Sequence, residues 1–395
     1  MLSTYRRVFG TRAIILPFLA MFVGCLSIGM PELAILLLVH SRTGSLGAAG
    51  IIAGLYSAGN AVGLVVQGRL IDRIGQTMVL VPAAVICGTA LSILALAADS
   101  VVTIGVCAVI GGLGLPAMIT AMRALIPQIL LDERDRTIAY AILAVTFSVA
   151  GLLGALVASG LLAVFGPAGA ILTAAGFACA GGLTFAATRA SRRWKPATRQ
   201  PHGPLFSPGV RTLVASNIGL GFCAGLTVVG IPAIALRHGD TSLAPLLFAV
   251  GSIGDLAGGF GYGSREWPMA RIRQLVLALL AAAALTFCVA GAVGQLAVLF
   301  PIMLLSGAAG APAGIATSSL LDDVARHDAL AQTYAVIVCA GLLSGSAGAA
   351  VGGAIADAVG PRLLFVAAGV GLTAVAGWTV LRRKTLQRRQ ILTFG

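Results

Sequence analysis

Long apolar runs alternate with short polar segments along the whole chain. Each run holds about 20 residues, the length that an α-helix needs to cross the hydrocarbon core of a bilayer. The pattern therefore predicts an all-α membrane protein with twelve transmembrane helices. The predicted spans are residues 13–38, 46–68, 77–98, 101–124, 138–164, 168–189, 211–236, 243–263, 272–293, 296–320, 333–356 and 362–381.

Composition agrees with a chain whose solvent is lipid. Hydrophobic residues make up 58% of the 395 residues and charged residues 10%, whereas an average soluble domain has about 25% charged residues. The net charge of +13 comes from basic residues that lie between the apolar runs, not on an amphipathic face. Because such charges are topology signals, we expect the bilayer, and no nucleic acid, as the large partner.

The basic residues also predict the orientation. If the N-terminus is cytoplasmic, 23 of the 26 basic residues fall in cytoplasmic segments, and only Arg42, Arg237 and Arg362 fall in external loops. This distribution follows the positive-inside rule. The dominance of Arg over Lys, with abundant Ala and Gly, is typical of a GC-rich bacterial gene. We predict a multi-pass protein of the bacterial inner (cell) membrane with both termini in the cytoplasm.

One long polar interruption divides the chain. Residues 190–210 are rich in Arg and Pro, and their four prolines exclude a regular helix through much of the segment. We predict a six-helix bundle over residues 1–189, a cytoplasmic linker over 190–210 and a second six-helix bundle over 211–395. The linker is expected to lie near anionic lipid because of its charges.

The two halves share residues at a nearly constant offset. Tyr140 and Gly166-Pro167 recur 194 residues later as Tyr334 and Gly360-Pro361, and the segment Ser57–Gly63 recurs at an offset of 195 as Ser252–Gly258. Six spans return each half to the side where it started, so the repeats run parallel. Parallel repeats are typical of transporters that rock about a substrate site near the midplane.

The segment after the second span reads Gly68-Arg-Leu-Ile-Asp72-Arg73-Ile-Gly75. It resembles the signature between the second and third spans of the major facilitator superfamily, and the twelve-span layout agrees over essentially the whole chain. The resemblance implies a gating role for Gly68, Asp72, Arg73 and Gly75, with Asp72 facing a positive helix N-terminus. A solvated pair of loop charges is the alternative interpretation.

Other positions depart from the pattern of that superfamily. Gln76 and Thr77 replace the basic residues that usually follow the signature, and Ala108 stands at the place of the arginine that many members have in the fourth span. Ala155 replaces the proline of the Gly-Pro pair that proton-coupled drug exporters carry in the fifth span. General similarity to actinobacterial efflux members remains, and it implies an exporter of drugs or metabolites.

Eleven of the thirteen acidic residues fall in loops or at span ends, which leaves Glu32 and Asp255 inside predicted spans. A charge at the bilayer centre costs about 2.5–3.5 kcal/mol on insertion scales, so such residues are candidates for function. Asp255 lies on a face of small residues that suits a bundle interior. Glu32 follows Pro31, and it is a proton-site candidate by resemblance to related exporters. Both are predicted to couple transport to protons, and a structural carboxyl, or for Glu32 a partial outward snorkel, is the alternative.

Further polar residues are candidates for substrate binding. Asn60, the counterpart of Asp255, shares a stripe at helical spacing with Tyr56 and Gln67, and this stripe faces a cavity or serves bonds between helices. The remaining candidates are Asn217, Tyr140, Tyr334 and Arg123, of which Arg123 lies near a cytoplasmic span end and is as well suited to anchoring there.

These features favour a secondary active transporter that exports small, largely apolar compounds in exchange for protons. An importer of a sugar or another small solute in the same fold is the nearest alternative. The four histidines lie apart in loops or span ends, and no cysteine pair has metal-ligand spacing. We therefore expect no enzyme activity, no metal and no cofactor. A non-transporting membrane sensor or an intramembrane enzyme is the alternative from another functional class. A monomer is expected to be the working unit.

Overall fold

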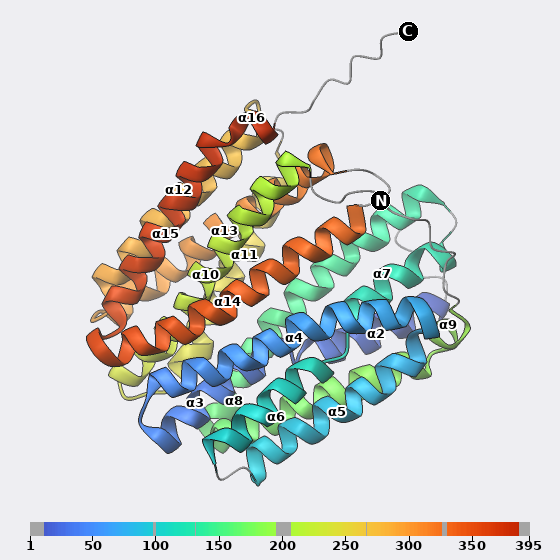
Figure 1. Ribbon diagram of the computed structural model, residues 1–395, viewed down its shortest axis with the longest axis horizontal. Helices are drawn as coiled ribbons and strands as arrows, with labels where there is room; N and C mark the ends of the chain where they lie inside the picture. The colour runs from blue at the N-terminus through green and yellow to red at the C-terminus, as the bar shows by residue number, and fades with distance from the viewer. Residues whose placement is uncertain are drawn as a thin grey trace. The chain divides into compact units, whose positions relative to one another are not determined.

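The computed structural model describes residues 12–97, 100–130, 132–194, 207–265, 267–325 and 330–386, and every regular element in them is a helix (Figure 1). The helices of the first half are α2 (Arg12–Cys25), α3 (Met30–Thr43), α4 (Leu46–Ile74), α5 (Gln76–Leu96), α6 (Val101–Gly114), α7 (Met118–Ile129), α8 (Glu133–Ala187) and α9 (Arg189–Arg193). Those of the second half are α10 (Pro208–Arg237), α11 (Leu243–Gly263), α12 (Arg271–Ala292), α13 (Leu296–Val324), α14 (Leu330–Val359), α15 (Pro361–Leu381) and α16 (Arg383–Leu386).

These helices make twelve membrane crossings, as the apolar runs predict. Eleven helical stretches of the described chain are long and apolar enough to span a bilayer. One of them, Val145–Ala187, has 43 residues and extends over about 65 Å, which is twice the hydrocarbon thickness. Gly166 interrupts it with φ 67° and ψ −171°, just before Pro167. This kink divides α8 into the fifth and sixth spans, so the predicted fold class is confirmed.

Two spans of the first half are broken near their middle. The first span ends its first helix at Cys25, turns through Leu26–Gly29 and resumes at Met30, with Gly29 at φ 83°. The fourth span is interrupted between Gly114 and Met118. Hydropathy does not reveal these breaks, because apart from Ser27 the turn residues are apolar or glycine. Among the described residues of the second half, the corresponding helices α10 and α13 are continuous.

The break in the fourth span is held by one side chain of the second span. The Gln67 amide donates from Nε2 to the carbonyl oxygens of Leu113 and Leu115, 2.9 Å in each case, and its Oε1 accepts from the N–H of Ala117 at 3.0 Å. Gln67 is 5% exposed. Since water cannot reach these backbone groups in a bilayer core, the glutamine supplies the partners that the missing helical turn leaves open.

Replacing Gln67 with Leu therefore removes three hydrogen bonds from the break at nearly constant volume. Hydrogen bonds inside membrane proteins average about 0.6 kcal/mol, so we expect a loss of about 2 kcal/mol and a lower midpoint of thermal unfolding in detergent. Gln295→Ala is the matched control, because Gln295 is exposed and its side chain caps nothing. An unchanged midpoint for Gln67→Leu would show that the break is held by other contacts.

Glycines bring α4 and α6 into backbone contact. A Cβ placed on Gly59 would overlap the carbonyl oxygen of Val109, and one on Gly63 would overlap that of Leu113. From the other side, a Cβ on Gly112 would overlap the carbonyl oxygen of Tyr56. Close approach of helices through small residues is a common way to pack spans without a hydrophobic driving force.

The same contact recurs between α11 and α13 of the second half. Cβ atoms on Gly254, Gly258 and Gly307 would overlap the carbonyl oxygens of Leu304, Ala308 and Gly251 respectively. Each of these six residues lies 195 positions after its counterpart in the first half. The internal repeat that the sequence shows is therefore also a repeat of helix packing.

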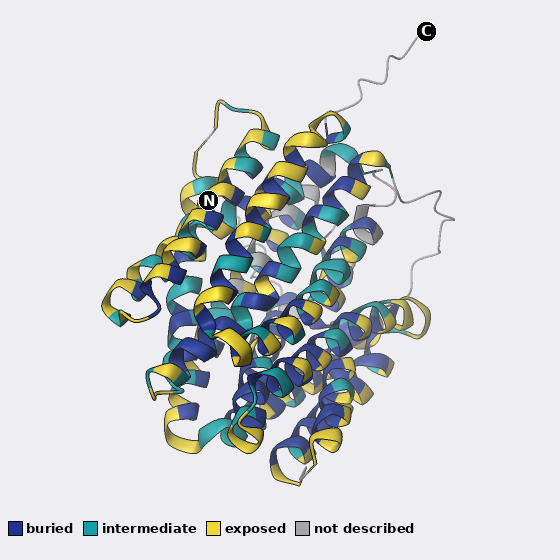
Figure 2. Ribbon diagram, turned by 60° about the vertical axis from the view of Figure 1, so that its left-hand side comes forward, coloured by how far each residue is buried: buried dark blue, intermediate teal, exposed yellow. Residues whose placement is uncertain are grey.

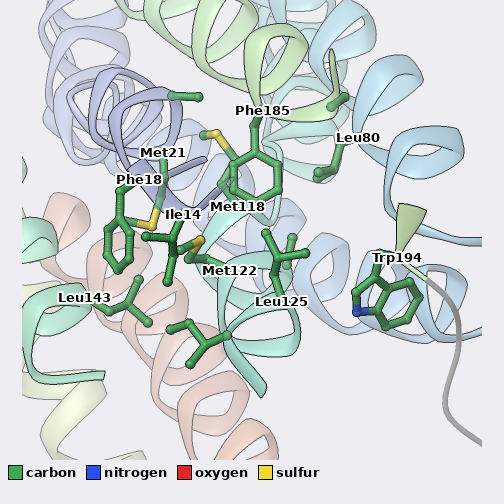
Figure 3. Close-up of a cluster of buried hydrophobic side chains, with 14 of the residues drawn as sticks. Ile14, Phe18, Met21, Leu80, Met118, Met122, Leu125, Leu143, Phe185 and Trp194 are labelled. Atoms are coloured by element: carbon green, nitrogen blue, oxygen red, sulfur yellow. The ribbon is translucent and has the colours of Figure 1, made fainter. Parts of the chain in front are cut away.

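Each half has its own apolar core, and large apolar side chains also cover the outside. Figure 3 shows the core of the first half, where Phe18, Met21, Met118 and Phe185 meet from α2, α7 and α8. In Figure 2 exposed residues occur along the bodies of the helices and not only in the loops. Large apolar residues that are exposed within the helices include Leu305 of α13 and Val370 of α15, which are 54% and 57% exposed. Such side chains are suited to contact with lipid tails.

The chain forms two compact units. One contains Met1–Arg199 together with Pro232–Ala249, and the other contains Gln200–Ile231 together with Val250–Gly395. The end of α10 and the beginning of α11 thus belong to the first unit, where the Ser159 hydroxyl donates to the carbonyl oxygen of Ser242 at 3.0 Å. The predicted division at 190–210 stays a prediction, and residues 195–206 of that segment lie outside the described residues.

Candidate functional site

Glu32 lies in the first turn of α3, directly after the break in the first span. Gly29 precedes that helix in the left-handed conformation, and Pro31 occupies its first turn. In the turn between α2 and α3, the Ser27 hydroxyl donates to the carbonyl oxygen of Gly24 at 2.7 Å. The break therefore places an acidic side chain at the positive end of a half-helix in the interior of a span.

The side chain of Glu32 is directed toward α4. Its carboxyl group accepts a hydrogen bond from the hydroxyl of Ser57, and the Tyr56 ring lies close enough to interact electrostatically with it. The Tyr56 residue is 4% exposed, and its hydroxyl has no hydrogen-bond partner in the described part of the chain. Within its own unit, no described basic side chain pairs with Glu32. The sequence had not linked Glu32 to this side of α4.

The polar stripe on α4 divides into three environments. Tyr56 is buried beside Glu32, and Gln67 is fully used by the break in the fourth span. Asn60 is half-buried, and its backbone lies against Gly112 of α6. Of the two roles predicted for this stripe, hydrogen bonding between helices applies to Gln67. The side-chain amide of Asn60 makes no hydrogen bond to another described residue, and its role in substrate binding stays a prediction.

Asp255 occupies the corresponding position in the second unit, one residue after Gly254 of the α11–α13 contact. The predicted small-residue face of α11 packs on α13, and a Cβ on Gly310 would lie 3.9 Å from Oδ1 of Asp255. The side chain itself is exposed. Among the described residues of its unit, Asp255 makes no hydrogen bond or ion pair. The structure thus places this carboxyl at the edge of a close helix contact, without a cation beside it.

The weaker candidates lie on other helices. Asn217 on α10 donates from Nδ2 to the carbonyl oxygen of Ile337 on α14 at 2.6 Å. Tyr140 is 39% exposed, and its hydroxyl lies 3.5 Å from the carbonyl oxygen of Arg123. Tyr334 on α14 is half-buried against the core of the second half. Arg123 on α7 is exposed. Their role in binding stays a prediction.

The loop with the family signature is a tight turn between α4 and α5. Gly75 has φ 95° and donates to the carbonyl oxygen of Ile71 at 3.0 Å, while Asp72 and Arg73 are exposed. Gly68 lies on α4 near Thr120. Gln76, which follows the signature, is 1% exposed and donates from Nε2 to the carbonyl oxygen of Ala121 at 2.9 Å.

Comparisons with known proteins agree with this arrangement. The sequence profile of the Major Facilitator Superfamily matches residues 17–349. The fold is similar to that of a bacterial homologue of the human lysosomal transporter Spinster in an inward-facing, unoccupied conformation, with 16% identity, 95% and 97% coverage of the two chains and a TM-score of 0.75. The nucleoside transporter NupG is 11% identical, with 94% of this chain and 100% of that chain covered and a TM-score of 0.77. The human organic anion transporter MFSD10 (TETRAN) is 19% identical, with 95% of this chain and 99% of that chain covered and a TM-score of 0.65.

No curated protein sequence matches the chain. At identities this low, similarity to the solved structures shows the fold and leaves the substrate open.

Proposed function

The chain belongs to the Major Facilitator Superfamily, and we propose that it is a secondary active transporter that exports small, largely apolar compounds in exchange for protons. Solved structures that share its fold include those of transporters. The parallel repeat and the matching helix contacts in both halves are typical of proteins that alternate access to a site between two bundles.

The environment of Glu32 is the observation that carries the coupling part. A carboxylate inside a span is costly unless a cation neutralises it or a proton binds to it. Glu32 has a hydroxyl donor, Ser57, and no basic partner within its unit. Among the described residues of its own unit, Asp255 has neither a hydroxyl donor nor a basic partner. Both groups are therefore suited to take up a proton on one side of the membrane and release it on the other.

Protonation biases the transport cycle only if it favours one conformation. A ligand shifts an equilibrium between two states by its difference in affinity for them, and this rule also applies to a proton. We propose that Glu32 and Asp255 both take up protons from outside, that transport needs both, and that the substrate competes for the same cavity. Asn60, Asn217, Tyr140 and Tyr334 are the proposed polar contacts for the substrate.

The spans offer little fixed charge for a charged substrate. Arg123 is the one basic residue that the sequence suggests for a cavity, and it is exposed near the end of α7. A carboxylate or phosphate substrate would need such a cation deeper in the span. The lack of one supports neutral or weakly charged, apolar substrates. At the cytoplasmic side, Gly68, Asp72, Arg73 and Gly75 are the proposed gate.

Inverted membrane vesicles from cells that overproduce the chain test the direction. Their lumen corresponds to the outside of the cell. With the lumen made more acidic than the medium, the chain is expected to accumulate radiolabelled chloramphenicol or the neutral dye Nile red, and an uncoupler should abolish this accumulation. Vesicles without the chain are the control. Accumulation that requires the opposite gradient would show proton-coupled import and contradict the proposal.

A further inference from the structure

Basic side chains gather where α12 begins and α15 ends. Arg273 lies in the first turn of α12, and Arg382, Arg383 and Lys384 follow α15 directly. All four are exposed. We call these four residues the basic patch. A surplus of positive charge at span ends is an ordinary topology signal. A binding site requires in addition that the charges are held together and face the lipid.

The packing of α12 on α15 brings the four residues to one level. The two helices run side by side in opposite directions (Figure 1). A Cβ on Gly369 of α15 would lie 2.8 Å from the ring of Phe287 on α12, so these two residues face each other. Arg273 precedes Phe287 by 14 positions, and Arg383 follows Gly369 by 14. In an antiparallel pair, equal steps from a contact lead to the same level along both helices.

Three contacts fix the end of α15 and the short helix α16. The guanidinium of Arg382 lies over the ring of Trp378, 5.0 Å from its centroid. The Thr385 hydroxyl is bonded to that of Thr212 on α10 at 2.8 Å, and Leu386 is 2% exposed in the core of the second half. The charges between Trp378 and Leu386 are therefore on an anchored turn, not on a loose tail.

Little negative charge lies nearby to neutralise them. The carboxylate of Asp323 on α13 pairs with Arg271 at 2.8 Å. Among the described residues, Arg273, Arg383 and Lys384 have no ion pair. Even if Glu266 and Asp322, whose side chains lie outside the described residues, are counted as neighbours, the patch keeps a positive surplus.

Apolar side chains adjoin the basic patch on the lipid side. Leu381 is 80% exposed, Val380 43% and Leu277 of α12 55%. Trp378, 37% exposed, presents an indole at the same level, where tryptophan is typical of the interface between headgroups and tails. A soluble anion would use only the charges, whereas a phospholipid uses both the charges and the apolar surface.

We propose that the basic patch of Arg273, Arg382, Arg383 and Lys384 binds the phosphate headgroup of an anionic phospholipid, with its acyl chains along Leu277, Val380 and Leu381. Basic pockets between span ends are known to select such headgroups. The patch lies at the membrane face to which the chain's C-terminal end returns, which the charge distribution assigns to the cytoplasmic leaflet.

Native mass spectrometry of the full-length protein in detergent tests this site, with dioleoylphosphatidylglycerol as the probe and dioleoylphosphatidylethanolamine as the zwitterionic reference. Wild type is expected to bind phosphatidylglycerol in preference. In the variant Arg273→Gln/Arg383→Gln/Lys384→Gln that binding should weaken by at least about tenfold, since each basic residue near a membrane surface contributes about fivefold to anionic-lipid affinity.

The matched control is Arg42→Gln/Arg237→Gln/Arg362→Gln, which removes three exposed charges from the other face and should bind as wild type does. Arg273→Lys/Arg383→Lys keeps the charges and should keep most of the affinity. Undiminished lipid binding by the glutamine variant would overturn the proposal, as would an equal loss in the control. Displacement of the lipid by equimolar inorganic phosphate would also overturn it, because it would assign a soluble anion.

Discussion

Glu32→Gln is expected to abolish proton-driven accumulation of substrate while leaving downhill exchange of that substrate intact. The glutamine keeps the size of the side chain and a partner for Ser57, so the fold and the cavity should persist. It removes the carboxyl group that, in the proposed mechanism, takes up the proton. The measurement is accumulation of a transported compound in proteoliposomes with an imposed pH gradient, compared with counterflow in the same preparation without a gradient.

Asp255→Asn is expected to reduce the same accumulation to the level of protein-free vesicles. Asp323→Asn is the matched control for both variants, because Asp323 is a partly exposed carboxylate near the end of a span, in an ion pair with Arg271. It should change accumulation by less than about twofold, as expected for an exposed ion pair. If Glu32→Gln and Asp255→Asn both lose counterflow together with accumulation, their role is structural or in substrate binding, not in coupling.

The second large effect is expected for Gly307→Val on α13. Its side chain would meet the carbonyl oxygen of Gly251 on α11, and backbone cannot yield as a flexible side chain can. Overpacking of this kind costs about 3 kcal/mol or more when no side chain can move aside. We expect a strong loss of folded protein after extraction and a much lower midpoint of thermal unfolding in detergent.

Gly314→Val is the control for that prediction. Gly314 lies on the same helix, and a Cβ there has no neighbour within 4 Å, so the change of intrinsic helix propensity is the same without the clash. The counterpart Gly112→Val on α6 should behave like Gly307→Val, because its Cβ would meet the backbone of Tyr56. Equal stability of the Gly307 and Gly314 variants would contradict the view that α11 and α13 pack through their backbones.

The spans and the repeat could be predicted from the sequence because both depend on strong local signals. Run length alone located α4, α5 and α12 to within a few residues at most ends. The offset of 195 residues, seen first as matched glycines, turned out to relate helix contacts. Gly166 and Gly360 also share positive φ values, 67° and 85°, each before a proline. At these positions the backbone geometry requires glycine, so the constraint is visible in the sequence as a glycine.

The breaks in the first and fourth spans could not be predicted in the same way. Apart from Ser27 their residues are apolar or glycine, so the mean hydropathy stays high through both breaks. Pro31 and Pro116 were the available signals, but Pro232 and Pro312 lie inside continuous helices of the second half. What distinguishes the fourth span is a partner far along the chain, Gln67, whose amide replaces the missing backbone bonds.

The same limit applies to the candidate site. The sequence singled out Glu32 and Tyr56 by depth and spacing, but not as neighbours, because they lie on different spans. It also grouped Gln67 with Asn60 on one face of α4. In the structure the Gln67 amide is hydrogen-bonded to the break in the fourth span, whereas Asn60 is half-buried. Helical periodicity assigns a residue to a face, whereas the identity of the helix packed on that face depends on tertiary structure.

Infrared difference spectroscopy of the reconstituted protein tests most directly whether Glu32 and Asp255 bind the transported proton, and it requires no knowledge of the substrate. Spectra recorded in mildly acidic and mildly alkaline buffer are expected to differ in the band of protonated carboxyl groups. That difference should shrink in Glu32→Gln and in Asp255→Asn and vanish in the double variant, while Asp323→Asn leaves it unchanged. A double variant with the wild-type difference spectrum would contradict the account.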